Sequence, residues 1–365
     1  MIRPFAFLTL GLAVVASVTA PRAQDLPEPA YEAYDFFVIA GQSNAKGRGD
    51  APLSPAVASG VAYEALPTGE VIPLADPVGG AVTGSAWPAF ANAYTAATGR
   101  GVVVVGLATS GSVQVALDGD GGNKHWDVRT EDNLYTRNEV RARRALAAAE
   151  EALPGVSPAG WLWIQGGSDA RRIDDGRLTP DAYALGLRLL SERIADDWAV
   201  PLYLFVSGTD ARGDSPGFVA LRDEQNAADS LSNVMVVYRD AYTFPERGWM
   251  QPDNVHWAQP GLDEAGTTAG PIVGANRLAT LPPPPVPREA VVLYPNPARE
   301  RATVDAGCAF RFEVLDPLGR KLAIGRGDGP TLLPALPAGT YLVRVRPRAG
   351  TQAACSGTRR LVITR

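Results

Sequence analysis

The stretch DFFVIAGQSNAKGRG, residues 35–49, is the part of the sequence that decides the fold. Its first half, residues 35–40, is almost continuously apolar, which is typical of a strand covered on both faces. Its second half is a polar turn that opens with a glycine, Gly41. The serine of that turn, Ser43, therefore lies just beyond the end of a buried strand.

Further apolar strands follow this first one and alternate with helical segments. Runs of apolar residues predict strands at 101–108, 160–165, 201–207 and 233–238. Caps, periodicity and breakers predict helices at 86–98, at 138–153 and from Pro180 onward. Strands that alternate with helices predict a parallel sheet between two helical layers, a three-layer α/β fold. Ligands of such sheets bind beyond the carboxyl ends of the strands.

A run of prolines, LPPPPVP at 281–287, separates two parts of the chain. Such a run forms a stiff polyproline spacer that cannot join a sheet. We therefore expect a main domain at 24–280, a linker at 281–288 and a tail domain at 289–365. Short β runs in the tail alternate with turns that contain proline and glycine, and they lie at 291–294, 310–315, 341–345 and 361–364. This pattern predicts a small all-β, immunoglobulin-like sandwich.

The two parts differ in charge. Residues 24–280 hold 19 Lys and Arg against 33 Asp and Glu, a net charge of −14. Residues 289–365 hold 12 against 6, a net charge of +6. An acidic main domain argues against a nucleic-acid partner, because it cannot neutralise a phosphate backbone. The basic residues of the tail are scattered among apolar ones and indicate a solvated surface.

The N-terminus predicts export. Residues 1–23 combine a positive charge at Arg3, an apolar run of 14 residues at 5–18 and a cleavage point after Ala23, the organisation of a signal peptide. The run is too short to span a bilayer comfortably, and no later run is long enough, so no transmembrane segment is predicted. We expect a secreted or cell-surface protein. In an oxidising compartment its two cysteines, Cys308 and Cys355, can form one disulfide.

The chain has only two histidines, His125 and His256, so the choice of a neutral-pH general base is narrow. Asp253 precedes His256 by three residues. That spacing lets the carboxylate hold one imidazole nitrogen while the other accepts a proton from a hydroxyl. Ser43 offers such a hydroxyl at the end of the first strand. Ser43, His256 and Asp253 are therefore the predicted catalytic residues.

Two further strand ends offer hydrogen-bond donors. Gly111 follows the strand at 101–108 and presents a backbone N–H with no side chain in the way. Gln165 ends the strand at 160–165 and presents an amide. Together with the N–H of Ser43 they form a predicted oxyanion hole, in which each donor stabilises a tetrahedral intermediate by about 3 kcal/mol.

Substrate contacts are predicted at four residues: Gln42, Asn44, His125 and Trp126. The first two flank the serine. The other two lie in a glycine-rich stretch, where an aromatic ring can stack on a sugar, although a solvated loop is the simpler interpretation. No metal and no cofactor are predicted. The two histidines are far apart with no acidic cluster between them, and the acidic stretch at 118–123 lacks the last glutamate of a calcium loop.

Three segments carry a family resemblance: GQSNAKGRG at 41–49, WIQGGSDA at 163–170 and DNVHW at 253–257. Together they resemble the SGNH hydrolases, and more narrowly the carbohydrate O-acetylesterases that include sialate and acetylxylan esterases. Similar phrases lie between them, so the resemblance covers residues 34–275. One departure concerns Gly167, which occupies a position where members of the family usually have glutamate.

This resemblance implies a flavodoxin-like fold, with Ser43 as nucleophile, His256 as base and Asp253 as the residue that orients the base. It also implies that Ser43, Gly111 and Gln165 form the oxyanion hole. The departure at Gly167 removes none of these groups. The missing carboxylate bears on the order of the loop and on substrate contacts.

The tail resembles the C-terminal sorting domain of type IX secretion substrates. Four phrases carry this resemblance in order: YPNPA at 294–298, DPLGRKL at 316–322, LPAGTYLVRV at 336–345 and RRLVITR at 359–365. The resemblance implies that the type IX secretion machinery is a partner and that the tail is removed or used for surface attachment. The two cysteines are not part of that pattern.

These observations predict a secreted serine esterase that removes O-acetyl groups from carbohydrates through an acyl-enzyme. Two alternatives stay open. One is a carbohydrate-binding protein on the same fold with weak or no turnover. The other is a lipid or thioester hydrolase of the SGNH class, against which the lack of a long apolar lid argues.

Overall fold

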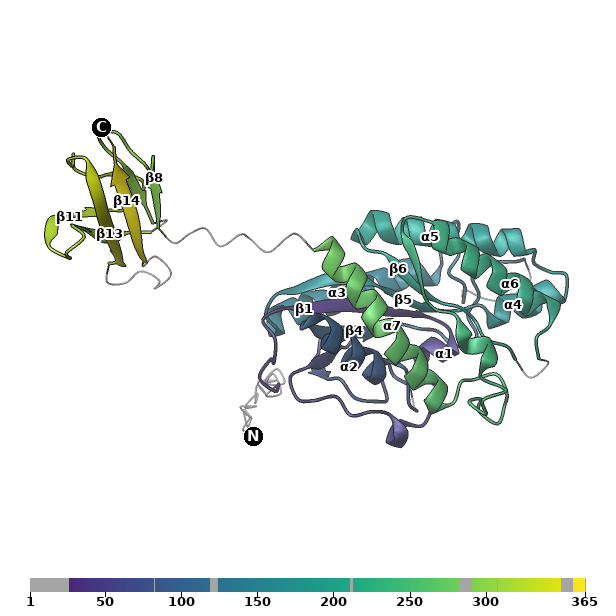
Figure 1. Ribbon diagram of the computed structural model, residues 1–365. Coiled ribbons are helices and arrows are strands. Elements are labelled where there is room, and N and C mark those ends of the chain that lie inside the picture. Colours follow the sequence, from purple (N-terminus) through teal and green to yellow (C-terminus); the bar gives the residue numbers. More distant parts are fainter. Residues whose placement is uncertain are drawn as a thin grey trace, which may run out of the picture. The chain divides into compact units, whose positions relative to one another are not determined.

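A computed structural model describes residues 26–364 except 82, 119–123, 211–212, 282–290, 307 and 349–356. The chain divides between Thr280 and Leu281 into two compact units, each of which is described by itself (Figure 1). The signal peptide expected at 1–23 lies outside the described residues, as does almost all of the linker expected at 281–288. In the described part of the chain, no helix is both long and apolar enough to cross a membrane.

The first unit is built on a seven-stranded sheet of order β3-β2-β4-β1-β5-β6-β7. Its strands are β1 (Tyr34–Gly41), β2 (Ala62–Ala65), β3 (Val71–Pro73), β4 (Gly101–Gly106), β5 (Val156–Ile164), β6 (Leu202–Phe205) and β7 (Val234–Tyr238). Neighbouring strands are parallel except β2 and β3, which pair antiparallel at one edge. The predicted parallel α/β sheet is confirmed at this level.

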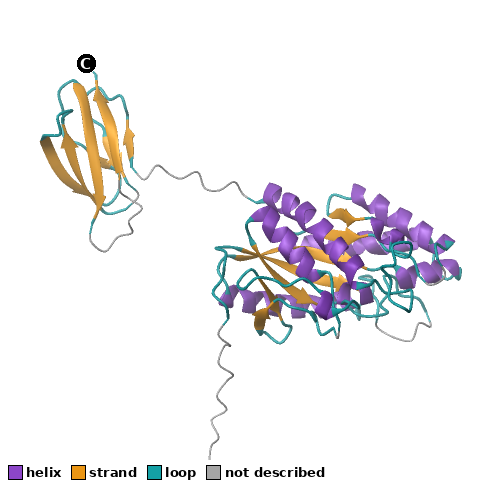
Figure 2. Ribbon diagram, turned by 60° about the horizontal axis from the view of Figure 1, so that its bottom comes forward, coloured by secondary structure: helices purple, strands orange, loops and turns teal. Residues whose placement is uncertain are grey.

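Helices cover both faces of this sheet (Figure 2). They are α1 (Ser43–Lys46), α2 (Trp87–Thr98), α3 (Leu134–Ala152), α4 (Gly167–Asp174), α5 (Pro180–Trp198), α6 (Pro216–Ala227) and α7 (Gln259–Thr280). Successive side chains of a strand point to opposite faces. In β1, Phe37 and Ile39 accordingly pack with α2 and α7, whereas Phe36 and Val38 face the cluster that includes α3, α5 and α6. The unit therefore has three layers.

The helices α2 and α7 approach each other closely. Gly266 of α7 lies so near α2 that a Cβ atom there would be 2.3 Å from the carbonyl oxygen of Ala86. A residue with a side chain would therefore force the two helices apart. This close approach sets how tightly α7 packs against α2.

The strand order reverses at β1. β4 lies on one side of β1 and β5 on the other, so the chain builds one half of the sheet and then crosses β1 to build the second half. Open α/β sheets bind ligands beyond the carboxyl ends of their strands where the order reverses. Ser43 follows β1 directly and lies at this place.

Some elements differ from the sequence-based expectation. The edge strands β2 and β3 were not predicted, because runs of four and three residues are too short to show a pattern. β5 begins at Val156, before the run predicted at 160–165. α3 begins at Leu134 and not at 138, because the Asn133 side chain accepts a hydrogen bond from the Thr136 N–H and caps the helix there.

The second unit consists of two antiparallel sheets of order β11-β10-β13-β14 and β12-β9-β8 around one apolar cluster. Its strands are β8 (Val292–Tyr294), β9 (Thr303–Asp305), β10 (Phe310–Leu315), β11 (Lys321–Gly327), β12 (Thr331–Leu332), β13 (Gly339–Pro347) and β14 (Gly357–Ile363). The predicted all-β tail is confirmed at this level, with β9, β11 and β12 as additional strands. Cys308 is disulfide-bonded, and Cys355 lies outside the described residues.

Candidate active site

Ser43 begins α1, a short helix that directly follows β1. Gly41 makes the turn between them with φ = 115°, and a Cβ atom there would lie 2.1 Å from the backbone oxygen of Ile164 in β5. Only glycine allows the chain to turn at this point against the neighbouring strand. The turn leaves Ser43 largely buried, on the wall of a cavity of about 310 Å³.

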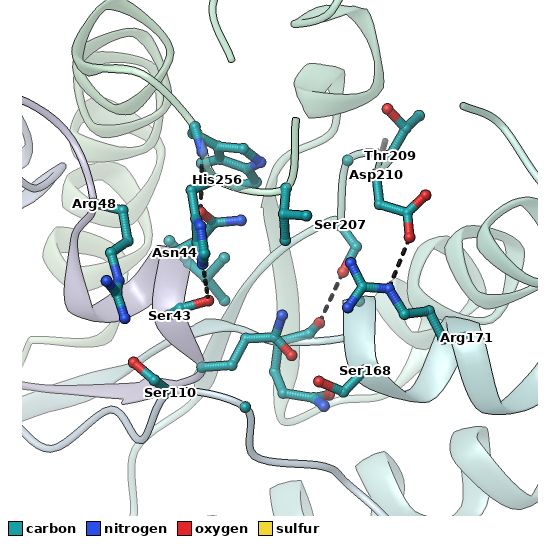
Figure 3. A pocket seen from close by; sticks show the side chains of 18 of the residues that line it. Ser43, Asn44, Arg48, Ser110, Ser168, Arg171, Ser207, Thr209, Asp210 and His256 are labelled. Carbon is teal, nitrogen blue, oxygen red and sulfur yellow. Dashed lines mark hydrogen bonds and ion pairs between the residues drawn. The ribbon is translucent and has the colours of Figure 1, made fainter. Parts of the chain in front are cut away.

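The structure brings the three predicted catalytic residues together (Figure 3). His256 Nε2 lies 2.8 Å from Ser43 Oγ, although 213 residues separate the two. His256 Nδ1 lies 2.6 Å from Asp253 Oδ2. A hydroxyl, an imidazole and a carboxylate are thus connected in series by hydrogen bonds, which is the arrangement that activates a serine nucleophile.

The loop that carries His256 is shaped by its own aspartate. Asp253 Oδ1 accepts hydrogen bonds from the backbone N–H groups of Val255 at 2.9 Å and His256 at 3.0 Å. Asn254 has φ = 52°, a left-handed conformation that asparagine tolerates better than most residues. One carboxylate therefore closes the turn with one oxygen and contacts the imidazole with the other.

A second set of contacts joins this loop to the serine turn. Asn44 Oδ1 accepts a hydrogen bond from the backbone N–H of Trp257 at 3.1 Å. Gln251 Nε2 donates to the backbone oxygen of Arg48 at 2.8 Å. Asn44, predicted as a substrate contact, lines the cavity and also holds His256 against Ser43.

The electrostatics of Asp253 suit an orienting carboxylate. Partial burial raises its pKa, but the hydrogen bonds from the His256 ring and from the two backbone N–H groups lower it more, to about 2. The side chain is 50% exposed. Asp253 is therefore ionised at neutral pH and favours the tautomer in which His256 carries its hydrogen on Nδ1.

Gly111 lies beside the serine turn because its loop is attached to the end of β1. The carbonyl oxygen of Gly41 accepts hydrogen bonds from the Thr109 N–H and the Ser112 hydroxyl, both at 3.0 Å. Gly111 has φ = 70° and lines the same cavity as Ser43. Two of the three predicted oxyanion donors therefore belong to adjacent loops on one cavity wall.

Gln165, the third predicted donor, also lines the cavity but is held by a buried network. Its Nε2 donates to Asp169 Oδ2, and its Oε1 accepts from the Tyr183 hydroxyl at 3.4 Å. Burial raises the pKa of Asp169 to about 6, although the Gln114 N–H and Gln165 donate to it. Asp169 engages one of the two amide hydrogens of Gln165 and fixes which end of the amide faces it.

The other predicted substrate contacts divide into two groups. Gln42 lines the cavity, and its Oε1 accepts a hydrogen bond from the Gly166 N–H at 3.2 Å. The prediction for Trp126 is wrong, because its side chain is fully buried and its Nε1 donates to Ser112 Oγ at 3.0 Å. The indole packs edge-on against Trp163 of β5, with ring centroids 5.0 Å apart. His125 is half-buried and is not among the residues that line the cavity.

Sequence reasoning missed the far wall of the cavity. That wall is formed by side chains of α4, of α6 and of the segment after β6: Ser168, Arg171, Thr209, Asp210 and Phe218. The signal was present in the sequence, because Thr209 and Asp210 are polar residues that follow a predicted strand, as Ser43 does. Within the described ranges, no cluster of three or more histidine, cysteine or acidic side chains is arranged to hold a metal ion.

Comparisons with known proteins show the fold. No family model and no curated protein sequence match the chain. A solved structure of a protein from Arabidopsis thaliana aligns with a TM-score of 0.51 and 20% identity, and the match covers 67% of this chain and 98% of that one. At this identity the match shows that the two proteins share a fold.

Two further solved structures align less well. NanS has a TM-score of 0.49 and 16% identity, over 70% of this chain and 100% of that one. A carbohydrate acetylesterase from Xanthomonas citri has a TM-score of 0.43 and 14% identity, over 90% of this chain and 78% of that one.

Proposed function

We propose that this chain is a serine esterase of the SGNH type that removes O-acetyl groups from carbohydrates. One observation carries the proposal: His256 lies within hydrogen-bond distance of both Ser43 Oγ and Asp253 Oδ2. Such an arrangement raises the nucleophilicity of a serine that is otherwise unreactive at neutral pH.

In the proposed reaction, His256 Nε2 takes the proton of Ser43 as Ser43 Oγ attacks the acetyl carbonyl carbon. The tetrahedral intermediate then collapses. The bond between the carbonyl carbon and the sugar oxygen breaks, and His256 gives its proton to that oxygen, so the sugar alcohol leaves. Water, deprotonated by His256, attacks the acetyl-serine in turn, and acetate leaves as Ser43 recovers its proton.

The negative charge of the intermediate develops on the former carbonyl oxygen. The N–H groups of Ser43 and Gly111 and the second amide hydrogen of Gln165 are the proposed donors to it. Asp169 acts on this oxygen indirectly, because it accepts from Gln165 and so orients the amide. Donors that are already fixed before the substrate binds stabilise the transition state without a reorganisation cost.

The cavity favours a sugar ester over a long acyl chain. Its volume of about 310 Å³ lies at the lower end of the range for small-molecule sites. Polar and charged side chains occupy much of its wall, among them Arg48, Ser110, Ser168 and Arg171. A long acyl chain would remove these groups from water without offering them hydrogen bonds, which is unfavourable.

The function is tested by acetate release from O-acetylated xylan, O-acetylated sialic acids and mono-O-acetylated methyl pyranosides. We expect hydrolysis of at least one of these, and a rate that falls steeply along a series of p-nitrophenyl esters as the acyl chain lengthens beyond acetyl. Glycan binding without any acetate release would instead support the carbohydrate-binding alternative. A preference for long acyl chains would support the lipid or thioester hydrolase.

We also propose that residues 1–23 direct export and that the tail domain is a type IX secretion sorting domain. The support is the signal-peptide organisation of 1–23 and the four phrases of the tail. Intact-mass analysis of the protein from the growth medium and the cell surface tests this. We expect a chain that begins at Gln24 and a tail that is cleaved or modified. Recovery of the full unprocessed chain from the cell interior would contradict the proposal.

A further inference from the structure

The outer face of the four-stranded sheet in the second unit is strongly basic. In this sheet, Phe310 and Phe312 of β10 are buried and point into the apolar cluster of the unit. Because successive side chains of a strand alternate between faces, Arg311 and Glu313 of β10 point outward. Glu313 is the one acidic residue of the four strands. Their basic residues number seven: Arg311, Lys321, Arg326, Arg344, Arg346, Arg359 and Arg360.

Three arginines lie side by side on this outer face. Arg311 of β10 is in register with Arg326 of β11 on one side and with Arg346 of β13 on the other. All three residues are exposed, and none makes an ion pair or a side-chain hydrogen bond with the described residues. Like charges at directly opposite positions of neighbouring strands destabilise a sheet. The row is therefore unfavourable for the unit by itself, and an anionic partner would remove this repulsion.

The one carboxylate of the outer face is already engaged. Glu313 is in register with Ile324 of β11 and with Arg344 of β13. Its carboxylate lies 2.5 Å from Lys321 Nζ and 3.6 Å from Arg344 Nη1. The hydrogen bond from Lys321 and the positive charges of the nearby arginines hold the pKa of Glu313 below its usual range. Glu313 is thus ionised and paired, and it leaves the charge of the arginine row without an ion-pair partner.

Large apolar side chains are exposed on the same hairpin. Ile324 is in register with Glu313, so it shares the outer face, and it is 76% exposed. Leu318, in the turn between β10 and β11, is 82% exposed, and Leu322 of β11 is 50% exposed. A soluble polyanion would gain nothing from these side chains. The boundary between lipid headgroups and acyl chains suits both kinds of group, because basic residues bind anionic headgroups and apolar residues enter the acyl region.

We infer that the outer face of this sheet binds a membrane surface that carries anionic lipid headgroups. The lipid phosphates lie against Arg311, Arg326 and Arg346, and Ile324 enters the boundary with the acyl chains. Membrane binding by the tail goes beyond the proposed esterase reaction and does not depend on it. Because the attraction is largely electrostatic, the binding weakens as salt screens the charges.

Strand pairing explains why the sequence alone indicated no more than a solvated surface. Arg311, Arg326 and Arg346 are scattered among apolar residues along the chain, and the register of β10, β11 and β13 brings them into one row. Their apolar neighbours in β10 and β13 turn to the other side of the sheet and form the core of the unit. Figure 1 labels β11, β13 and β14 of this sheet.

The test measures co-sedimentation of the protein with two kinds of vesicle. One consists of phosphatidylcholine alone, and the other of phosphatidylcholine and phosphatidylglycerol in equal parts. Residues 24–365, the form expected after export, are used, because the apolar run at 5–18 would itself bind lipid.

Two variants change the outer face, and a third is their matched control. The first combines Arg311→Gln, Arg326→Gln and Arg346→Gln, and the second is Ile324→Ser. The control removes the same number of charges at exposed positions outside this face, two in the loop between β8 and β9 and one on α5: Arg299→Gln, Arg301→Gln and Arg188→Gln.

We expect wild type to bind the mixed vesicles about 10-fold or more tightly than the phosphatidylcholine vesicles, and to lose this preference in concentrated salt. The combined arginine variant should bind the mixed vesicles about 10- to 100-fold more weakly than wild type, and Ile324→Ser about 3- to 10-fold more weakly. The control should bind as wild type does. All the replaced residues are exposed, so thermal unfolding should be unchanged, or shifted upward where the like charges of the row are removed.

The inference is overturned if wild type shows no preference for the mixed vesicles, or if the combined arginine variant binds them as wild type does. Heparin, a soluble polyanion without a bilayer, distinguishes the two sources of negative charge. Binding to heparin without binding to the mixed vesicles overturns the inference. Where both bind, Ile324→Ser decides: weaker binding to the vesicles alone supports a membrane surface, and unchanged binding to the vesicles overturns it. The proposed esterase function is judged separately, by hydrolysis of p-nitrophenyl acetate, which these variants leave unchanged.

Discussion

Replacement of Ser43 by alanine is expected to lower kcat for p-nitrophenyl acetate by about 10⁴- to 10⁶-fold. The proposed reaction begins with a bond from Ser43 Oγ to the acetyl carbon, and no other hydroxyl is held 2.8 Å from His256 Nε2 in the described residues. Without that oxygen, only binding and the oxyanion donors remain, and these leave a small residual rate. Steady-state and burst-phase kinetics measure the decrease in kcat.

The control for this variant is Ser191→Ala. Ser191 is fully buried in α5, and its hydroxyl bonds to the backbone oxygen of Arg188, away from the cavity. A normal rate in Ser191→Ala, with unchanged thermal unfolding of Ser43→Ala, assigns the loss to chemistry and not to folding. Full activity in Ser43→Ala would refute the esterase mechanism proposed for this chain.

Asp253→Asn is expected to lower kcat by about 10³- to 10⁴-fold. The asparagine Oδ1 can keep the bonds to the backbone N–H groups of Val255 and His256, so the loop keeps its shape. Its Nδ2, however, donates where the carboxylate accepted. His256 then carries its hydrogen on Nε2 and cannot take the proton of Ser43. Because the Asp253 side chain is 50% exposed, we expect the loss toward the lower figure.

The pH dependence of thermal stability distinguishes the expected loss of rate in Asp253→Asn from a loss of stability. The pKa of Asp253 is about 2 in the folded chain, below the usual value for aspartate, so its ionisation stabilises the fold above that usual value. This stabilisation is lost as the pH falls toward 2. The thermal stabilities of wild type and Asp253→Asn should therefore converge in acid, while their rates at neutral pH stay far apart.

Asp196→Asn, an exposed change on α5, is the control for this second variant. It should match wild type in both rate and stability. A wild-type rate in Asp253→Asn at neutral pH would exclude Asp253 as the orienting group.

The meeting of Ser43, His256 and Asp253 was predictable because the signals of these residues in the sequence are local or rare. Ser43 follows an apolar run and a glycine, and His256 is one of two histidines, with an aspartate at a fixed spacing. The parallel sheet was predictable from the alternation of strands and helices. The edge strands β2 and β3 were not predictable, since a strand of four residues and one of three are too short to show a pattern.

The far wall of the cavity and the position of Trp126 depend on tertiary contacts. Arg171 and Asp210 pair although 39 residues separate them, and neither residue shows this in its local sequence. Trp126 lies in a stretch that is rich in glycine and looks exposed. Its burial is decided by Trp163 of β5, which meets it only in the folded chain. Patterns of residue type therefore predict the serine side of this cavity better than they predict the residues that form its far wall.

The placement of His256 and its orienting carboxylate, Asp253, on one short loop has a consequence for how the site forms and how it loses activity. Asp253 and His256 already contact each other through local bonds, so their pairing needs no distant part of the chain. Within the described residues, the encounter between this loop and the turn after β1 joins that pair to Ser43. Early heat inactivation should therefore be all-or-none and reversible, because undocking of that single loop withdraws His256 and its orienting carboxylate at once while the sheet beneath stays intact.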